Sequence, residues 1–483
     1  MSATGGEGDL LQPRTVLVVG GGAREHALSW RLRQDPGVER VLEAPGNAGH
    51  TDVAEVHAEV QAHDHPAIMA LAGREHADLV VVGPEAPLVA GLADRLRAAG
   101  IPTFGPCAAA AALEGSKALC RRIATRAGVP MAPGAVFDAV TPALAYAAAL
   151  GGPVVVKADG LAAGKGVAVC ASLDEAEAAL RDAIERRVFG DAGRRVVVER
   201  ALSGREASVI AICDTTMALA LPAARDHKRI GEGDVGPNTG GMGAYSPVPD
   251  LDDAAVSRIV AEFHLPTLAA LAARGRPFRG ALYAGLMLTA EGPRLLEYNV
   301  RFGDPEAQAI LPRVAAPLAT LLLAAATDRL AMAAAALGIA GPLLPAHPDS
   351  AVAVVLAARG YPGTPATGDE IEGIEAARAT GALVFEAGTA RREGHAVTAG
   401  GRVLTVVGRG GDLGAAASAA HRAAGVVRFR GRQMRGDIGR SSIVNAPAIG
   451  RAGEPRVAMA SSNRPEALGS PDWPDAVPGE VVP

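Results

Sequence analysis

The sequence predicts a multidomain protein of mixed α/β and α+β class, with a doubly wound parallel sheet in its N-terminal domain. Three observations support this prediction. The 483 residues suffice for about three domains at roughly 150 residues each. Apolar strands alternate with helical segments over roughly the first hundred residues, as in parallel sheets covered by helices. Short strands then follow one another closely between residues 153 and 213, which suits an antiparallel sheet.

The N-terminal alternation can be followed element by element. Buried strands are expected at Thr15–Gly20 and Ala77–Pro84, and a further strand begins within Ile101–Pro106. Helices are expected around Glu25–Arg33 and at Ala93–Gly100, which ends in a glycine. The strands are uninterrupted apolar runs, and this indicates a sheet that is covered on both faces.

Composition and charge exclude several classes of protein. Hydrophobic residues make up 49% of the chain and charged residues 20%, so it can form several cores and is not disordered throughout. The net charge of -5 excludes an overall basic field for nucleic acid. The 4 cysteines form no CxxC pair, which excludes zinc-ribbon and thioredoxin motifs and suits reduced thiols in the cytoplasm.

Neither secretion nor a membrane span is expected. The first residues lack the apolar segment of a signal peptide. The most apolar stretch, Val314–Leu344, is interrupted by Pro317 and Asp328. It therefore falls short of about 20 continuous apolar residues and predicts a buried pair of helices.

A strand, a glycine turn and a helix make up the motif VLVVGGGAREHA. Backbone N–H groups at such a helix start attract phosphate or carboxylate. Gly20 and Gly22 match a dinucleotide-binding fingerprint, and Glu43 lies at a suitable distance. Glu25, however, occupies the position of the third glycine. A dinucleotide site, a tight packing turn and a site for another anion or an amine all remain open.

Three lysines surround the glycine loop GLAAGKGV. The loop is not a Walker A motif, because only three residues separate Gly160 from Gly164 and no hydroxyl residue follows Lys165. Its glycines still allow close backbone approach to a phosphate, and its lysine supplies charge. Lys157 lies in an apolar strand, where an unpaired ammonium is costly, and Lys117 precedes the loop. This combination of residues favours a loop that binds a nucleotide phosphate over a flexible turn that binds nothing.

The motif LLEYNVRFGDPE combines candidate metal ligands with an arginine. Glu297 and Asn299 are two residues apart in a strand and therefore point to the same face. Carboxylate and amide oxygens suit magnesium, which also takes phosphate oxygens. Arg301 continues this face if the strand runs that far, and it could stabilise a transferring phosphoryl group. The alternative is an edge-strand ion pair between Glu297 and Arg301.

The segment ARDHKRIGEGDVGPNTGGMGAYSP joins a charged run, which begins at Asp226, to a long glycine loop. The loop at Gly231–Pro247 has the composition of a substrate lid. His227 is either a general base or a structural histidine. Lys228 and Arg229 are expected on a solvated face.

Eight motifs occur in one order: GGGAREHA, PGNAG, GPEAPL, EGSK, VVKADGLAAGKGV, DHKR, GPNTGGMGAYSP and NVRFGDPEAQ. Together they resemble the phosphoribosylamine–glycine ligase family of purine biosynthesis, also called glycinamide ribonucleotide synthetases, which are ATP-grasp ligases. The resemblance covers about Thr15 to Gly439. It implies an N-terminal pre-ATP-grasp domain, a two-lobed ATP-grasp domain and a small C-terminal mixed β/α domain.

On this basis we expect five segments along the chain. They are a disordered leader at 1–13, the N-terminal domain at 14–114, the ATP-grasp domain at 115–335 with a small lobe at about 130–200, the C-terminal domain at 336–439 and a disordered tail at 440–483.

The resemblance places ATP, the co-substrate, between the two lobes. The residues implied to bind it are Lys117, Lys157, Gly164, Lys165, Gly166, Glu199, Leu202 and Glu206. Among them, Glu199 and the backbone of Leu202 would take the adenine edge, and Glu206 would hold the ribose hydroxyls. Glu297 and Asn299 would bind Mg²⁺ or Mn²⁺ bridging the phosphates.

The implied reaction joins glycine to 5-phosphoribosylamine through glycyl phosphate, with release of ADP and phosphate. Lys157, Asp226 and Arg301 are the candidate catalytic residues. The residues implied on the substrate side are Gly22, Asn47, Glu85, Asp226, Gly240, Gly241 and Arg301. The expected partners are small molecules only, and the expected protein is a cytoplasmic monomer without nucleic-acid or membrane partners.

Three other functions are weaker explanations of the sequence. An NAD-dependent oxidoreductase would need a third glycine in the first loop and leaves Lys157, Lys165 and Glu297 without a role. An ATP-grasp carboxylate–amine ligase or carboxylase for another small substrate keeps the ATP residues but leaves GPNTGGMGAYSP unexplained. A regulator that binds nucleotide without catalysis is opposed by the metal-ligand pair.

Overall fold

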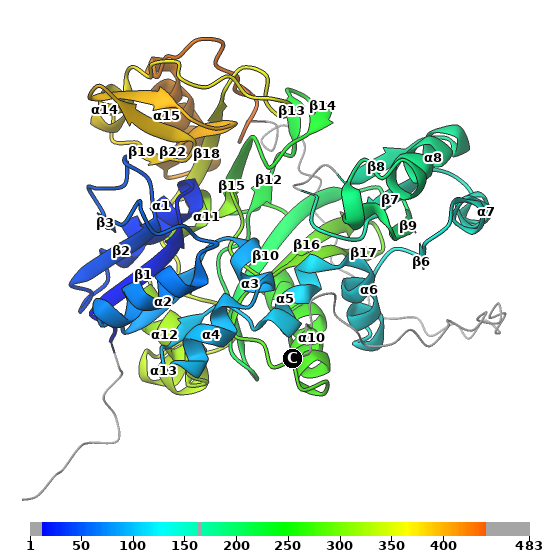
Figure 1. Ribbon diagram of the computed structural model, residues 1–483, viewed down its shortest axis with the longest axis horizontal. Coiled ribbons are helices and arrows are strands. Elements are labelled where there is room, and N and C mark those ends of the chain that lie inside the picture. Colours follow the sequence, from blue (N-terminus) through cyan, green and yellow to red (C-terminus); the bar gives the residue numbers. More distant parts are fainter. Residues whose placement is uncertain (1–11, 163–165, 441–483) are drawn as a thin grey trace, which may run out of the picture.

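The computed structural model describes residues 12–162 and 166–440, in which a body of three packed units carries one projecting lobe (Figure 1). The lobe is drawn in teal at the right, and the C-terminal unit lies at the upper left, above the N-terminal sheet. The predicted leader and tail lie outside the described residues, except for residues 12, 13 and 440.

The N-terminal unit is the expected doubly wound parallel sheet, in the order β3-β2-β1-β4-β5. Its strands are β1 (Thr15–Gly20), β2 (Arg40–Pro45), β3 (Glu55–Val56), β4 (Leu79–Val82) and β5 (Thr103–Phe104). Its helices are α1 (Ala23–Leu32), α2 (His65–Arg74), α3 (Glu85–Val89) and α4 (Leu92–Ala98). The strand order reverses at β1, so the carboxyl ends of β1 and β4 border the crevice where ligands bind in such sheets.

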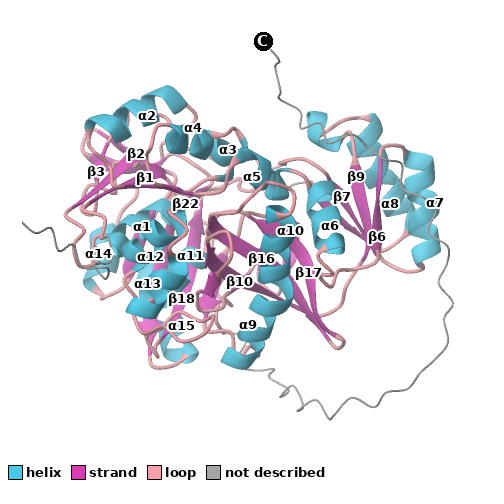
Figure 2. Cartoon of the chain, turned by 90° about the horizontal axis from the view of Figure 1, so that it is seen from below, coloured by secondary structure: helices cyan, strands magenta, loops and turns pink. Residues whose placement is uncertain are grey.

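Two four-stranded sheets follow, and both are antiparallel (Figure 2). The small lobe holds β6 (Gly134–Phe137), β7 (Val154–Ala158), β8 (Val167–Cys170) and β9 (Val196–Arg200), with α7 (Val140–Leu150) and α8 (Leu173–Leu180). The larger sheet holds β10 (Arg205–Cys213), β11 (Ala218–Ala220), β16 (Gly280–Thr289) and β17 (Gly292–Asn299).

Two helices, α5 (Ala108–Gly115) and α6 (Lys117–Arg126), follow one another with a break at Ser116. Ser116 breaks the helix, because its backbone is extended and its hydroxyl accepts the Leu119 N–H at 3.1 Å as an N-cap. The break directs the start of α6, and with it Lys117, toward the small lobe.

The C-terminal sheet crosses the domain boundary expected at 335/336. Its order is β12-β15-β18-β22-β19, from β12 (Arg225–Asp226), β15 (Gly243–Ser246), β18 (Ser350–Ala357), β22 (Arg402–Gly410) and β19 (Leu383–Glu386). The helices α14 (Ile374–Ala379) and α15 (Leu413–Val426) and the hairpin β20 (Thr389–Arg392)–β21 (His395–Thr398) complete this unit. Since β12 and β15 flank the glycine-rich loop, both ends of that loop are fixed to the C-terminal sheet.

Apolar helices fill the interior between the units. The helix pair expected within residues 314–344 is present as α12 (Leu318–Ala326) and α13 (Leu330–Ala336), preceded by α11 (Glu306–Ile310). A continuous helix, Asp253–Ala272, runs through α9 (Asp253–Ile259) and α10 (Leu265–Ala272); its length and composition alone would allow it to cross a membrane. Phe263 and Leu268 of this helix lie in the core that also contains Leu17 of β1.

A buried polar contact joins the N-terminal and C-terminal units. The Nδ1 of His50 lies 2.5 Å from the Glu43 carboxylate, and its Nε2 lies 2.9 Å from the Glu386 carbonyl. Burial opposes the charge on His50, but the bond to Glu43 outweighs it, so the pKa of His50 is raised. The neighbouring His26 has its pKa lowered well below its ordinary value, by burial and by the charge of His50.

We expect the stability of this contact to fall as the pH rises through the folded-state pKa of His50. A raised pKa means that the stabilisation is complete below about pH 6.5, the unfolded value, and is lost above the folded value. The shift of His26 has the opposite sign and acts only below about pH 6.5. The measurement is the thermal midpoint between about pH 6.5 and 9, for which His50→Gln should show a weaker decline. Equal declines in both proteins would contradict the assignment.

Candidate functional site

The candidate site is organised around Arg301, where three parts of the chain meet. Its guanidinium lies 2.9 Å from the carboxylate of Glu114 in α5 and 3.3 Å from that of Glu85, which begins α3 after β4. Strand β17 ends at Asn299, so Arg301 follows the strand and does not continue it as expected. Among the described residues, no ion pair forms between Arg301 and Glu297 within 4.0 Å, and the edge-strand alternative is therefore wrong.

Glu297 lies on β17 opposite Gly285 and faces basic side chains. Burial raises the pKa of Glu297, but the charges of Lys228, Lys157 and Lys117 outweigh it and hold the pKa below its ordinary value. A carboxylate kept ionised in this way can bind a divalent cation, and the ammonium groups around it can bind phosphates.

The described residues contain no group of three or more His, Cys, Asp or Glu side chains that could hold a metal ion alone. Glu297 and Asn299 provide one carboxylate and one amide on the same strand. That small, hard donor set fits Mg²⁺ or Mn²⁺, because such ions are commonly held by one or two carboxylates together with substrate phosphates. The residues present therefore fit a metal that arrives with a nucleotide.

Lys157 is buried and paired within the protein. Its Nζ lies 2.6 Å from the Glu199 carboxylate and donates to the Leu296 carbonyl at 2.9 Å. The second Glu199 oxygen accepts from Arg121 at 2.8 Å. The expectation that a phosphate partners Lys157 is thus incomplete, because Glu199, which the resemblance assigns to adenine, neutralises it here.

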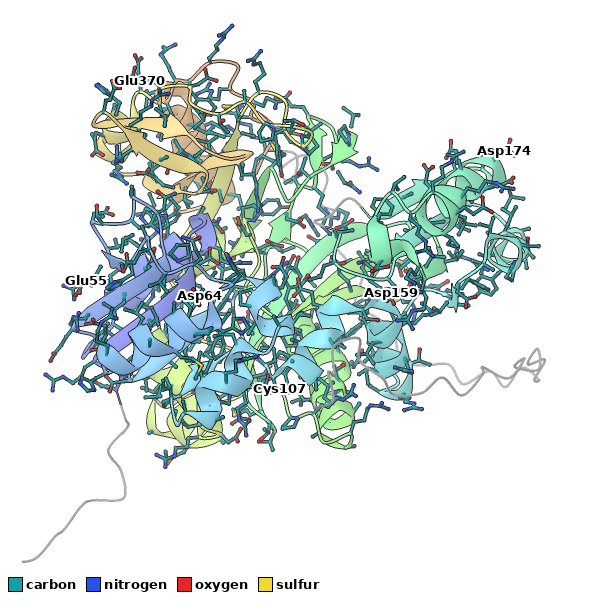
Figure 3. All side chains as sticks on the ribbon, viewed as in Figure 1. Glu55, Asp64, Cys107, Asp159, Asp174 and Glu370 are labelled. Carbon is teal, nitrogen blue, oxygen red and sulfur yellow. The ribbon has the colours of Figure 1, made fainter. Side chains whose placement is uncertain are left out.

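Asp159 connects the start of the glycine loop GLAAGKGV to α6. It lies at the base of the small lobe, whereas Asp174 lies toward the outer end of this lobe (Figure 3). The Asp159 carboxylate accepts from the Ser116 hydroxyl at 2.7 Å and pairs with Arg195 at 2.6 Å. Lys117 donates to the Gly160 carbonyl at 3.3 Å, so it stands at the loop entrance. Gly166 packs so closely on Ala162 and Ala158 that a Cβ would collide. Gly164 and Lys165 lie outside the described residues.

Lys228, expected on a solvated face, is half-buried, and its charge acts on Glu297. Its Nζ is 2.6 Å from the Glu206 carboxylate, and Glu206 and Asp226 raise its pKa well above the ordinary value despite burial. Burial raises the pKa of Asp226 to about 7, with Glu306 and Glu206 acting in the same direction and Lys228 against them. Arg229 instead donates to the Gly236 carbonyl at 2.7 Å, within the glycine-rich segment.

His227 is held as a structural residue. Its backbone bonds to Gly243 and Met242, and its Nδ1 lies 3.5 Å from the Asp234 carboxylate. The side chain is buried, and its Nε2 has no hydrogen-bond partner within the described part of the chain. This arrangement favours the structural interpretation over the general base.

Glu25 fills the glycine turn after β1. Its carboxylate accepts the Gly22 N–H at 2.8 Å and pairs with Arg24 at 2.6 Å. A Cβ on Gly83 would lie 2.1 Å from this carboxylate. A pyrophosphate would meet a carboxylate where the dinucleotide fingerprint needs open backbone N–H groups, so the dinucleotide alternative is excluded.

The other residues expected on the substrate side are divided between two places. Asn47 donates its amide to the Ala387 and Thr389 carbonyls at 2.6 and 3.1 Å, so it is engaged with the C-terminal unit. Gly240 and Gly241 lie beside Asp304 and Pro305, in the segment that follows Arg301. Leu202, which the resemblance assigns to adenine and not to this side, is half-buried after β9.

Sequence reasoning missed Glu114 and Arg402. Glu114 accepts the Val300 N–H at 2.8 Å in addition to pairing with Arg301, and the motif EGSK was the only signal for it. Arg402 bonds to Gly240 and Asp304 from the C-terminal unit, and no local motif indicated this contact.

Solved structures share this three-unit fold. A biotin carboxylase from Campylobacter jejuni has a TM-score of 0.64 at 17% identity, covering 90% of this chain and 96% of its own. A phosphoribosylamine–glycine ligase from Thermotoga maritima has a TM-score of 0.72 at 32% identity, covering 88% of this chain and 99% of its own. The fold and the lysine-lined site define an ATP-dependent ligase of the ATP-grasp class.

The family is shown by models of all three units. The phosphoribosylglycinamide synthetase N domain matches residues 14–114, the ATP-grasp (A) domain 115–307 and the C domain 351–441. A phosphoribosylamine–glycine ligase from Mesorhizobium japonicum is 46% identical over 433 residues, which are 90% of this chain and 99% of that protein. One from Pseudomonas aeruginosa is 47% identical over 431 residues, 89% of this chain and 98% of its own. The chain belongs to the phosphoribosylglycinamide synthetase family.

We expect the Asp226 carboxyl to titrate near pH 7 in the free protein, because it is buried beside other carboxylates. Carbon-detected NMR of selectively labelled aspartate would follow it, with Asp226→Asn to assign the signal. Lys228→Met should raise the midpoint by removing a favourable charge, and Glu206→Gln should lower it. A midpoint near 3.8 would show that burial does not control this group.

Proposed function

We propose that the chain joins glycine to 5-phosphoribosylamine at the expense of ATP, giving glycinamide ribonucleotide, ADP and phosphate in purine biosynthesis. The observation that carries this proposal is the contact of Lys157 with the Leu296 carbonyl at 2.9 Å, next to Glu297, on which the charges of Lys117 and Lys228 also act. Family membership over all three units supports the same reaction.

The basic side chains bind and orient the triphosphate. Lys117 approaches from α6 and Lys157 from the small lobe. Lys117 bonds to the Gly160 carbonyl and Lys157 to Glu199, and a phosphate can replace both of these partners. Glu297 and Asn299 would hold Mg²⁺ or Mn²⁺, which when bound neutralises charge on the phosphates and helps to align them. The protein contributes positioning and charge stabilisation, and no side-chain nucleophile is needed.

The first step forms an acyl phosphate. A glycine carboxylate oxygen attacks the γ-phosphorus, the bond to the β-bridging oxygen breaks, and ADP leaves with the electron pair. Arg301 would stabilise the transferring group, and its pairing with Glu85 and Glu114 fixes its direction.

The second step forms the amide. The amine of phosphoribosylamine attacks the acyl carbon, phosphate leaves, and the nitrogen loses a proton. Asp226 would accept that proton, because its pKa of about 7 leaves a useful ionised fraction near neutral pH. The glycine loop would exclude water from the acyl phosphate.

We further propose that the protein acts in the cytoplasm as a monomer on these small molecules. The thiols of Cys107, Cys120, Cys170 and Cys213 are all free, which suits a reducing compartment.

The decisive assay follows ADP release with ATP, a magnesium salt, glycine and freshly prepared phosphoribosylamine. We expect release to require both glycine and the amine, with glycinamide ribonucleotide formed in equal amount. Release that ignores glycine, or that follows another carboxylic acid or bicarbonate, would favour a different ATP-grasp ligase or a carboxylase.

Glu297→Gln should lower kcat by about 100-fold or more, since it removes the charged ligand of the divalent cation. The affinity of the protein for Mn²⁺ with ADP, followed by electron paramagnetic resonance, should fall as well. Glu291→Gln is a matched control, because Glu291 precedes the same strand and pairs with Arg294 at an exposed position. Near-normal turnover and Mn²⁺ affinity in Glu297→Gln would remove this residue from the metal site.

A further inference from the structure

The C-terminal unit binds both backbone polar groups of Gly240 in the glycine loop. Arg402, at the start of β22, donates from Nη1 to the Gly240 carbonyl at 2.7 Å. The Gly240 N–H donates to the Tyr361 hydroxyl at 2.9 Å. The loop therefore takes its position near Gly240 from two side chains outside the ATP-grasp segment.

The Arg402 guanidinium also binds the segment that follows Arg301. The Arg402 Nη1 donates to the Asp304 carbonyl at 2.7 Å, and its Nη2 lies 3.0 Å from the Asp304 carboxylate. Burial raises the pKa of Asp304, but Arg402 and then Arg24 outweigh this effect and hold the pKa below its ordinary value. The carboxylate is consequently available as a partner for Arg402 across the neutral range.

Three arginines from different units contact residues 302–304 or lie next to them. Arg24 of α1 and Arg301 both donate to the Phe302 carbonyl at 3.2 Å, and Arg402 takes the neighbouring Asp304. The N-terminal, ATP-grasp and C-terminal units thus meet at residues 302–304. A change in the position of this segment would move Arg301, the candidate catalytic arginine, directly.

The packing leaves little freedom around these bonds. A Cβ on Gly240 would lie 3.1 Å from the guanidinium carbon of Arg402, and one on Gly241 would lie 2.4 Å from the Pro305 ring. The planar guanidinium can bind two carbonyls and a carboxylate at once, whereas an ammonium is a single point of attachment. The contact thus requires an arginine on β22 and glycine in the loop.

We propose that Arg402 is a positioning residue that holds the Gly240 loop against residues 302–304, so that the acyl phosphate reacts with the amine and not with water. The inference rests on the proposed function. In the side reaction, water attacks the acyl carbon, the carbon–oxygen bond to phosphate breaks, and glycine and phosphate are released. Each such event consumes one ATP without forming an amide.

The test compares ADP and glycinamide ribonucleotide formed by the full-length wild type and by Arg402→Met. Wild type should give about one ADP per amide, whereas the variant should give a clear excess of ADP. The KM for phosphoribosylamine should rise about 10- to 100-fold, and the KM for ATP should change by less than about twofold. Arg402→Lys should recover only part of the coupling.

Arg409→Met is the matched control. Arg409 lies on the same strand, is partly exposed, and pairs with Asp349 at 2.6 Å, away from the loop. It should retain wild-type coupling and KM values, and if it uncouples as Arg402→Met does, the effect belongs to the strand and the inference is wrong.

Tyr361→Phe gives a second test that leaves Arg402 in place, and it decides the matter if Arg402→Met does not fold. It removes the acceptor for the Gly240 N–H and should also release excess ADP. A wild type that does not require glycine would overturn the proposed function itself. A glycine-dependent, coupled wild type alongside fully coupled loop variants would overturn only the role of Arg402.

Discussion

The pairing of Arg301 with Glu85 and Glu114 is the interaction on which the rest of the site depends. A buried guanidinium must be compensated, and here the two carboxylates come from segments far from it in the sequence, 216 residues away for Glu85. Because Glu114 also accepts the Val300 N–H, the side chain and the backbone beyond β17 are fixed together. The end of β17 is thereby fixed relative to α5 and to the crevice of the parallel sheet.

The basic side chains of the candidate site are paired with carboxylates of the protein itself. Lys157 is held by Glu199, and Lys228 by Glu206. Paired charges are less costly to bury than isolated ones, so a basic cluster can be kept inside the fold. A triphosphate with its cation offers the same balance of charge and can therefore exchange partners with these side chains. A local basic cluster is therefore compatible with a chain whose net charge is -5.

The C-terminal unit contributes side chains to the candidate site and also packs beside it. Its sheet takes β12 and β15 from the ATP-grasp segment, and Arg435 binds Asp234 in the hairpin β13 (Arg229–Gly231)–β14 (Val235–Asn238) at 2.6 Å. The segment expected to be a long loop is therefore anchored at its hairpin, at both ends and at Gly240. A lid fastened in this way can exclude water with little conformational entropy left to lose.

The sequence by itself determined what depends on neighbouring residues. Uninterrupted apolar runs fixed the strands of the parallel sheet, and the two-residue period of a strand put Glu297 and Asn299 on one face. The tertiary structure alone decided which charged side chains pair with each other. No local signature in the sequence indicates the pairing of Lys157 with Glu199, the pairing of Lys228 with Glu206 or the contact of Arg402 with Asp304, 98 residues away. Partners of this kind are chosen by how the sheets and helices pack, because a side chain's environment in the fold comes mostly from residues distant in the sequence.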